Sequence, residues 1–286
     1  MDEQTEYGGR TLKQHRNFGF QITMTRYLRE KSAEIKLERG QGKHQDTLAT
    51  PTEITQMRGV VGKLNCASRE GMPQGAGDAS LLAGTLPTPK VKDLTAANAA
   101  LRRLLQNDAP IQIKPIPLDR LGLLSFSDSS LGNAGQGKAQ LANIVCAVDK
   151  SIHLGKEADI SIVAYRSHKK TRAASSTLLN ESCALSETLA DAAWVAAWFG
   201  LAKNLDYDLR RRDHLNREIK ITSILSEKDC ELDIASITDA KSLYDALTQE
   251  QYTGAEKRAA LEICVIRDSL EAMGGKARTY NHFWNS

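Results

Sequence analysis

The chain has 286 residues, of which 41% are hydrophobic and 26% charged, a globular composition that excludes a disordered or fibrous protein. No run of 18 apolar residues is present and the first residues are acidic, so we expect an intracellular protein, cytoplasmic or nuclear, with no membrane partner. Five widely spaced cysteines without a Cys-x-x-Cys pair indicate neither a disulfide framework nor a zinc site.

Charge is distributed unevenly along the chain. Residues 1–118 hold 17 Lys and Arg against 12 Asp and Glu, whereas residues 119–286 hold 21 against 23. A basic region beside an acidic one suits a polyanionic substrate, because cations bind phosphates while acids recruit metal ions. Ordinary solubility charge explains a surplus of this size equally well.

The front of the chain predicts a mostly helical segment over residues 1–118. One β-like stretch precedes it, and helical periodicity with caps and stops comes after. The expected elements are a strand at 18–24 and helices at 26–37, from Thr50 to 64, at 78–82 and at 94–105.

Prolines mark a domain border between residues 108 and 120, because Pro110, Pro115 and Pro117 are unsuited to a helix interior. Beyond them, apolar β-like runs alternate with helical periodicity, which predicts an α/β domain over residues 119–286. Strands are expected at 122–127, 141–148, 160–165, 234–238 and 277–284, and helices at 176–201, 240–249 and 255–273.

Carboxylates stand at corresponding ends of these elements. Asp128 ends the strand-like Leu121–Asp128 stretch and is followed at once by Ser129, Ser130 and Gly132. On the 176–201 helix, at 100° per residue, Glu181 lies on the apolar stripe of Leu185 and Leu189, whereas Glu187 lies opposite. A carboxylate on a core-facing stripe is costly unless it is paired or bound to metal, so Glu181 is the site candidate.

Asp239 ends the strand-like Ile234–Asp239 stretch. Taken alone, it is equally well explained as the N-cap of the next helix. Its place in a series of acids on strand, helix, strand and helix favours a site role. Such a series indicates a metal-dependent site that cleaves phosphodiesters.

The fourth acid is Glu262, with Asp268 as the alternate. Glu262 falls among Ala259, Val265 and Ile266 on the last helix, where burial favours metal binding, while Asp268 lies at the edge of that stripe. A buried arginine partner would be the structural alternative for Glu262.

Several motifs resemble the ribonuclease H region of copia-type retrotransposon polyproteins. They are Ser127-Asp-Ser129, the stretch from Tyr165 to Thr177 followed by Glu181 and Ala184-Leu-Ser-Glu187, and Thr238-Asp-Ala-Lys-Ser-Leu243. The front of the chain is similar, more weakly, to the preceding segment of those polyproteins, through Met57–Leu64 and Leu101–Leu105.

The resemblance implies a ribonuclease H-like mixed five-stranded sheet flanked by helices, preceded by a thumb- or connection-like part of a reverse transcriptase over residues 1–118. It implies cleavage of the RNA strand of an RNA/DNA hybrid with Mg²⁺ or Mn²⁺. Asp128, Glu181 and Asp239 take the family's first three catalytic places, while Ala260 falls where an Asp is usual. No Tyr-x-Asp-Asp motif is present, so we expect no polymerase activity from this chain alone.

Five basic residues are candidate contacts to nucleic acid: Arg102, Arg103, Arg166, Lys169 and Lys170. For the Arg102-Arg103 pair a solvated helix face is the commoner explanation, and the same holds for the mixed charges of an expected exposed insertion at 205–233. Besides the hybrid, the rest of a reverse transcriptase is an expected partner.

Two rival functions remain. A decayed or domesticated fragment that binds nucleic acid or a partner without cleavage would explain Ala260. A transposase or integrase with three acids would share the fold, but those enzymes place their Glu after the second Asp, and Glu181 precedes Asp239.

Overall fold

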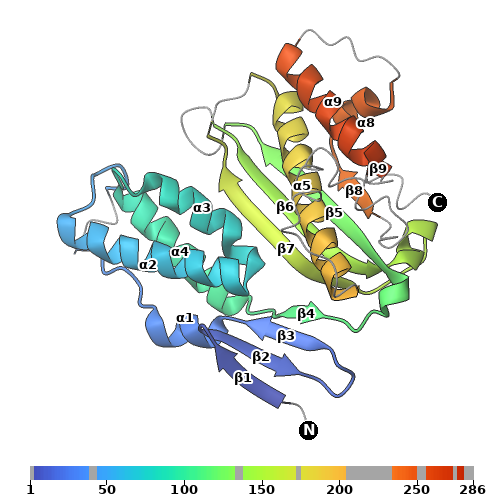
Figure 1. Ribbon diagram of the computed structural model, residues 1–286. Helices are drawn as coiled ribbons and strands as arrows, with labels where there is room; N and C mark the ends of the chain where they lie inside the picture. The colour runs from blue at the N-terminus through green and yellow to red at the C-terminus, as the bar shows by residue number, and fades with distance from the viewer. Residues whose placement is uncertain are drawn as a thin grey trace. The chain divides into compact units, whose positions relative to one another are not determined.

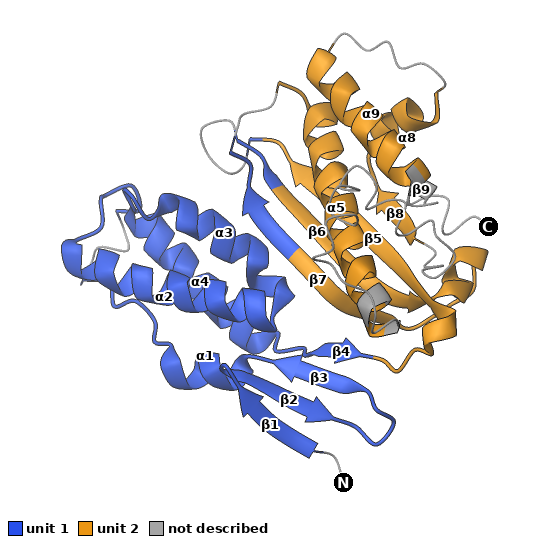
Figure 2. Ribbon diagram, in the orientation of Figure 1, with its two compact units in different colours: residues 1–113, 132–140, 166–172 blue, residues 114–131, 141–165, 173–286 orange. Residues whose placement is uncertain are grey.

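The structure is a computed structural model that describes residues 3–38, 44–132, 138–171, 175–203, 234–249, 256–272 and 276–279. The expected insertion at 205–233 lies outside these ranges, as does the second half of the expected strand at 277–284. The chain divides into two compact units, each treated by itself (Figure 2). Unit 1 holds residues 1–113, 132–140 and 166–172, and unit 2 holds residues 114–131, 141–165 and 173–286.

Unit 1 begins with an antiparallel sheet, of which the mostly helical prediction for residues 1–118 included only the strand at 18–24. Its strands pair in the order β1 (Glu3–Tyr7), β2 (Arg10–Gln14), β3 (Phe20–Thr23) and β4 (Ile111–Ile113). The overlooked signal is Gly8-Gly9, which joins β1 and β2 with φ of 58° and 81°. Positive φ at both central residues is what a tight hairpin turn requires, and glycine adopts it without steric cost.

The described part of this unit also contains the α-helices α1 (Thr25–Lys31), α2 (Pro51–Glu70), α3 (Ala76–Thr85) and α4 (Val91–Gln106). Their apolar faces share one core, in which Met57, Leu64 and Leu94 are fully or almost fully buried. The helix predicted over 26–37 ends at Lys31 instead. The chain then runs extended, because the buried Asn98 side chain on α4 accepts from Ile35 N at 2.8 Å and donates to Ile35 O at 3.0 Å.

The N-terminus of α2 is fixed by a capping box built on a buried acid. Thr50 N donates to Glu53 Oε2 at 2.9 Å, and Glu53 N donates to Thr50 Oγ1 at 3.4 Å. Glu53 is only 1% exposed, so its carboxylate depends on donors within the protein, namely Thr50 N, Thr50 Oγ1 at 3.1 Å and Glu38 N at 3.4 Å, in place of water.

We predict that Glu53→Ala lowers the free energy of unfolding of the chain by about 1–3 kcal/mol, because buried backbone donors at the helix start lose their acceptor. Chemical denaturation measures the loss. Thr52→Ala, at an exposed neighbour in the same helical turn, is the control and is expected to change stability by less than about 0.5 kcal/mol. Equal effects of the two substitutions would contradict the capping role.

Unit 2 is built on a mixed sheet, in agreement with the α/β class expected for this region. Its strand order is β7 (Ile160–Lys169), β6 (Gln140–Asp149), β5 (Leu121–Ser130), β8 (Ile234–Thr238) and β9 (Lys276–Thr279). The pairs β5–β8 and β8–β9 are parallel. The links at 131–139 and 150–159 are too short for the crossover that parallel neighbours need, so β5, β6 and β7 form an antiparallel meander.

The chain passes to unit 2 after Ile113, inside the interval of 108–120 predicted for the border. Residues 132–140 and 166–172, which include the first residue of β6 and the last residues of β7, group with unit 1.

Helices α5 (Thr177–Lys203), α8 (Lys241–Thr248) and α9 (Lys257–Ala272) cover one face of the sheet (Figure 1). Leu123 and Val145 from the strands meet Leu185 and Leu189 of α5 and Ile263 of α9 in one core cluster. The other face has a smaller cluster of its own. Within the described ranges, the helices are all too short or too polar to cross a membrane.

Candidate metal centre

Three carboxylates meet at one edge of the unit 2 sheet. Asp128 lies near the end of β5, Asp239 follows β8 directly, and Glu181 lies near the start of α5. One oxygen from each lies within 4.8 Å of the others. These are the first three acids that the sequence placed in a common site, and the structure brings them together.

The pairing of β5 with β8 explains why the two aspartates are neighbours. The strands are parallel, and Ser127 stands opposite Thr238 in their register. Asp128 and Asp239 are the next residues after this pair, so both lie at the same edge of the sheet, near the carboxyl ends of adjacent strands. Figure 1 shows β5 beside β8.

A buried hydrogen bond reinforces this register. Ser125 and Ser236 face each other on the two strands, and their hydroxyl oxygens lie 2.6 Å apart. A slip of the pairing would break this bond between two buried hydroxyls and would separate the aspartates, so the same register serves stability and the site.

Glu181 reaches the cluster from the core-facing side of α5. The predicted stripe is confirmed, since Leu185, Leu189 and Ala192 are buried against the sheet and Glu181 is 5% exposed. Ser129 Oγ donates to Glu181 Oε1 at 2.6 Å. The other oxygen, Oε2, is buried and has no hydrogen-bond partner among the described residues.

An unsatisfied buried carboxylate oxygen costs free energy, which a bound cation would recover. Three carboxylates offer oxygen ligands only, the donor set that suits Mg²⁺ or Mn²⁺ rather than zinc. The chemistry of the cluster therefore fits a hard divalent ion.

The alternative role of Asp239, as N-cap of the next helix, is wrong. The N-cap of α8 is Ala240, and no side chain caps this helix. Ala240 N donates instead to Thr238 Oγ1 at 3.2 Å, so the exposed Asp239 carboxylate is left to the acidic cluster.

Burial, with a smaller contribution from the nearby charges of Asp128 and Asp239, raises the pKa of Glu181 from its usual 4.5 to about 7, against the lowering effect of the Ser129 hydrogen bonds. The folded protein without metal therefore retains a proton on Glu181 up to near-neutral pH. A divalent ion favours the charged form, so ion binding at this site releases that proton below about pH 7.

We predict that this group makes the metal-free protein less stable as pH rises from 4.5 to 7. In that window the folded state holds a proton that the unfolded state has released, and above it the penalty is constant at roughly 3 kcal/mol. Glu181→Gln removes the titration, so the stability of this variant relative to the wild type is expected to increase over the same window. Denaturation in EDTA at several pH values measures it, and parallel pH profiles of the two proteins would refute the shift.

The fourth acid does not join the three. Ala259, Ile263 and Ile266 of α9 are fully buried, whereas Val265, predicted as part of the stripe, is 50% exposed. The stripe is therefore rotated towards Ile263, because that residue and not Val265 meets the core. Glu262 lies beside this stripe and is half-buried.

Asp268 is exposed on the far side of the same helix, and neither acid belongs to the group within 4.8 Å. Arg267 of this helix, the candidate for a buried arginine partner, donates hydrogen bonds to backbone carbonyls. Its Nε donates to Leu247 O at 3.2 Å, and its Nη2 donates to carbonyls of Ala246 and Gln249 at the end of α8.

The five predicted nucleic-acid contacts lie outside this cluster. Arg102 and Arg103 are exposed on α4 and bond to acids of unit 1, Glu34 at 2.7 Å and Asp78 at 2.8 Å. This pairing agrees with the interpretation of Arg102 and Arg103 as part of a solvated helix face. The remaining three lie at or just after the end of β7, where Arg166 is exposed and Lys169 and Lys170 are half-buried.

No protein-family model and no curated protein matches this chain. Among solved structures, the chain is similar to the ribonuclease H1 of the halophilic archaeon Halobacterium salinarum NRC-1, with 14% identity and a TM-score of 0.33 over 56% of this chain and 88% of that one. A likeness of this size carries no argument about function. The observations that bear on function are the strand order of unit 2 and its acidic cluster.

Ser129 is the site residue whose contact the sequence did not specify. The signal lay in strand alternation, because Leu123, Ser125, Ser127 and Ser129 share one face of β5 and Leu123 packs with the α5 core. A serine at that position of the strand end is within reach of an acid on the first turns of α5.

Proposed function

We propose that unit 2 is a ribonuclease H-like endonuclease that cleaves the RNA strand of RNA/DNA hybrids. One observation carries the proposal: Asp128, Glu181 and Asp239 converge within 4.8 Å, and one Glu181 oxygen is buried without a partner among the described residues. The sheet supports the assignment, because an antiparallel meander of β5, β6 and β7 is continued by the parallel strands β8 and β9. Asp128 lies on β5, and Asp239 directly follows β8.

Asp128, Glu181 and Asp239 would hold two Mg²⁺ or Mn²⁺ ions, and such ions would supply an activated water and positive charge for the leaving oxygen. The exposed Asp128 and Asp239 face solvent, where a phosphate can approach, while the buried Glu181 anchors the cluster to α5. Ser129 would position Glu181 by holding Oε1, which leaves Oε2, without a hydrogen-bond partner among the described residues, available to an ion. The hybrid would be recognised by its shape, its phosphates and the 2′-hydroxyls of its RNA strand.

We further propose, on the sequence resemblance, that the chain derives from a copia-type retrotransposon and that unit 1 corresponds to the thumb- or connection-like part of its reverse transcriptase. The alternative function is a decayed or domesticated fragment that binds nucleic acid or a protein partner without cleaving. The observation that favours it is the three-acid cluster, which includes neither Glu262 nor Asp268.

The proposal predicts that Asp239→Asn lowers Mg²⁺-dependent cleavage of a labelled hybrid by at least about a hundredfold, because a shared metal ligand is lost. Stability of the metal-free protein should be unchanged or higher, since one of the clustered negative charges is removed. Asp245→Asn on α8, whose acid pairs with Lys241 at 2.6 Å, is the matched control and should cleave normally. Normal cleavage by Asp239→Asn, with normal folding, would sink the assignment.

A second prediction concerns the fourth acid. If Glu262 serves the ions from beyond the three-acid group, Glu262→Gln should raise the Mg²⁺ concentration for half-maximal cleavage by about three- to tenfold, while Asp268→Asn should leave it unchanged. The half-buried position of Glu262 beside the α9 stripe motivates this order. The reverse order would give the place to Asp268, and no change in either variant would mean that three acids suffice.

A further inference from the structure

The first turn of α5 is fixed by a serine cap. Ser176 stands immediately before Thr177, where α5 begins, and its hydroxyl oxygen accepts from Leu179 N at 3.1 Å. Its backbone oxygen accepts from Asn180 N at 3.3 Å. This is the arrangement of an N-cap, in which a hydroxyl supplies the acceptor that a helix start lacks. Glu181 follows Asn180 directly, so the place of the first turn determines where this acid is held.

A carboxylate from another helix bonds to this cap. Glu256 stands immediately before Lys257, where α9 begins, and its side chain accepts from the hydroxyls of Ser175 and Ser176, one on each carboxylate oxygen. Glu256 O also accepts from Ala260 N at 3.1 Å, at the start of α9. One side chain therefore joins two helix starts that are 80 residues apart in the chain, and α5 and α9 lie side by side (Figure 1).

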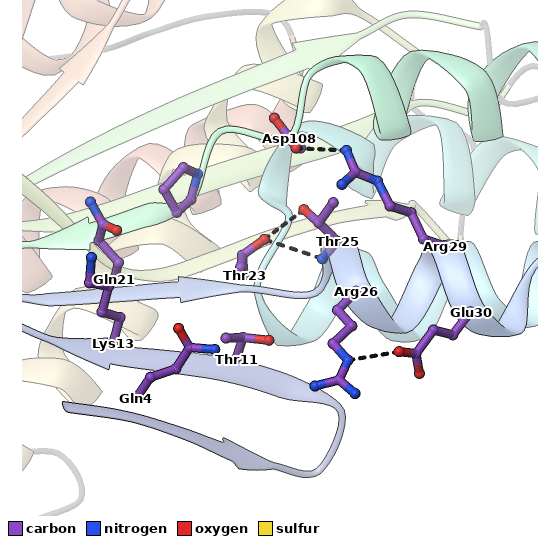
Figure 3. A pocket seen from close by; sticks show the side chains of 11 residues that line it. Gln4, Thr11, Lys13, Gln21, Thr23, Thr25, Arg26, Arg29, Glu30 and Asp108 are labelled. Carbon is purple, nitrogen blue, oxygen red and sulfur yellow. Dashed lines mark hydrogen bonds and ion pairs between the residues drawn. The ribbon is translucent and has the colours of Figure 1, made fainter. Parts of the chain in front are cut away.

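Acids on the surface of unit 1 make a different kind of contact. In the cavity of about 510 Å³ shown in Figure 3, Glu30 bonds to Arg26 at 2.7 Å and Asp108 bonds to Arg29 at 3.1 Å. Exposed ion pairs of this kind tolerate many geometries and are weak in water. A carboxylate that bridges the hydroxyls of two consecutive residues is confined more closely, and the partial positive charge at two helix N-termini favours its negative charge there. The contact of Glu256 therefore fixes a geometry.

The backbone of α5 does not need this carboxylate, because the Ser176 hydroxyl already accepts from Leu179 N. What the carboxylate adds is a fixed position of the helix start beside α9. That position matters because Glu181 is the acid of the three that a helix supplies, whereas Asp128 and Asp239 are set by the β5–β8 register. The apolar stripe of α5 resists rotation, but apolar contacts are non-directional and allow sliding along the sheet. Hydrogen bonds at the helix start are directional and oppose that sliding.

We propose that Glu256 is a positioning residue of the candidate metal centre. By bonding to the Ser175 and Ser176 hydroxyls it holds the start of α5 in place, so that Glu181 keeps its oxygens within reach of a divalent ion shared with the two aspartates. Glu256 itself is outside the three-acid group. The inference deepens the proposed function and rests on it, since it assigns to the same ions a residue that acts through a helix and not as a ligand.

The test measures Mn²⁺ binding directly, in the full chain and without nucleic acid. Free Mn²⁺ is followed by electron paramagnetic resonance, and thermal melting in EDTA reports the stability of each variant. Glu256→Ala removes the bridge, while Ser175→Ala removes one of its two hydrogen bonds and keeps the Ser176 cap. Glu271→Ala, which removes an exposed acid at the other end of α9, is the matched control. Asp239→Asn identifies the binding that belongs to the three-acid cluster.

We expect Glu256→Ala to raise the Kd for Mn²⁺ about three- to tenfold and Ser175→Ala to raise it about twofold, because a misplaced ligand binds the ion less well. The double variant should bind no more weakly than Glu256→Ala alone, since both changes remove the same contact. Glu256→Gln, which keeps the side-chain length and one acceptor oxygen, should bind more tightly than Glu256→Ala. Glu271→Ala should bind like the wild type.

A purely structural contact would give a different result. A lower melting temperature of Glu256→Ala, with an unchanged Kd of the folded protein for Mn²⁺, would overturn the proposal. So would an equal rise of the Kd in Glu256→Ala and Glu271→Ala. Should Glu256→Ala not fold, Ser175→Ala decides the question, and an unchanged Kd in that variant has the same meaning.

Failure of this proposal and failure of the nuclease are distinguishable in the same samples. If the wild type cleaves the RNA strand of a hybrid with Mg²⁺ and Glu256→Ala binds Mn²⁺ like the wild type, the positioning role is refuted and the nuclease stands. If the wild type binds Mn²⁺ at the cluster without cleaving and Glu256→Ala weakens that binding, the positioning role stands and the nuclease is refuted. A wild type that binds no Mn²⁺ would refute both.

Discussion

Mutual repulsion among three carboxylates is the constraint around which unit 2 is arranged. Asp128, Glu181 and Asp239 converge within 4.8 Å, and Glu181 is buried with one oxygen unpartnered among the described residues. A fold maintained only by stability would separate such groups or pair each with a cation. This one keeps them together, and the pKa of Glu181 is raised, chiefly by burial and further by the charges of the two aspartates.

The scaffold withstands this repulsion because each acid comes from a rigid element. The β5–β8 register, reinforced by the buried Ser125–Ser236 contact, fixes the two aspartates side by side. The long α5 helix brings Glu181 from the core side, and its apolar stripe against the sheet prevents it from rotating away. Placement on strand ends and a helix start leaves the aspartates open to solvent and the glutamate enclosed, an arrangement suited to holding ions at the protein surface.

The helical periodicity of the sequence was sufficient to predict that Glu181 faces the core. The stripe test placed Glu181 correctly, because α5 is long and its core side is dense in Leu and Ala. The same test misplaced the α9 stripe, since Val265 is apolar but half exposed and only tertiary packing distinguishes it from Ile263. Of the front sheet only the strand at 18–24, which is β3, was predicted, and the other strands were missed for a related reason. Its strands carry Gln, Thr and Lys on one face and few apolar residues, so alternation was weak and only Gly8-Gly9 marked the hairpin.

The proposed reaction depends on the acidic cluster of unit 2. The most direct measurement of that claim uses an RNA/DNA hybrid labelled separately on each strand and incubated with the full chain, with and without Mg²⁺. The account predicts cleavage of the RNA strand only, and only when Mg²⁺ is present. An intact RNA strand in saturating Mg²⁺, or equal cleavage in EDTA, would contradict it.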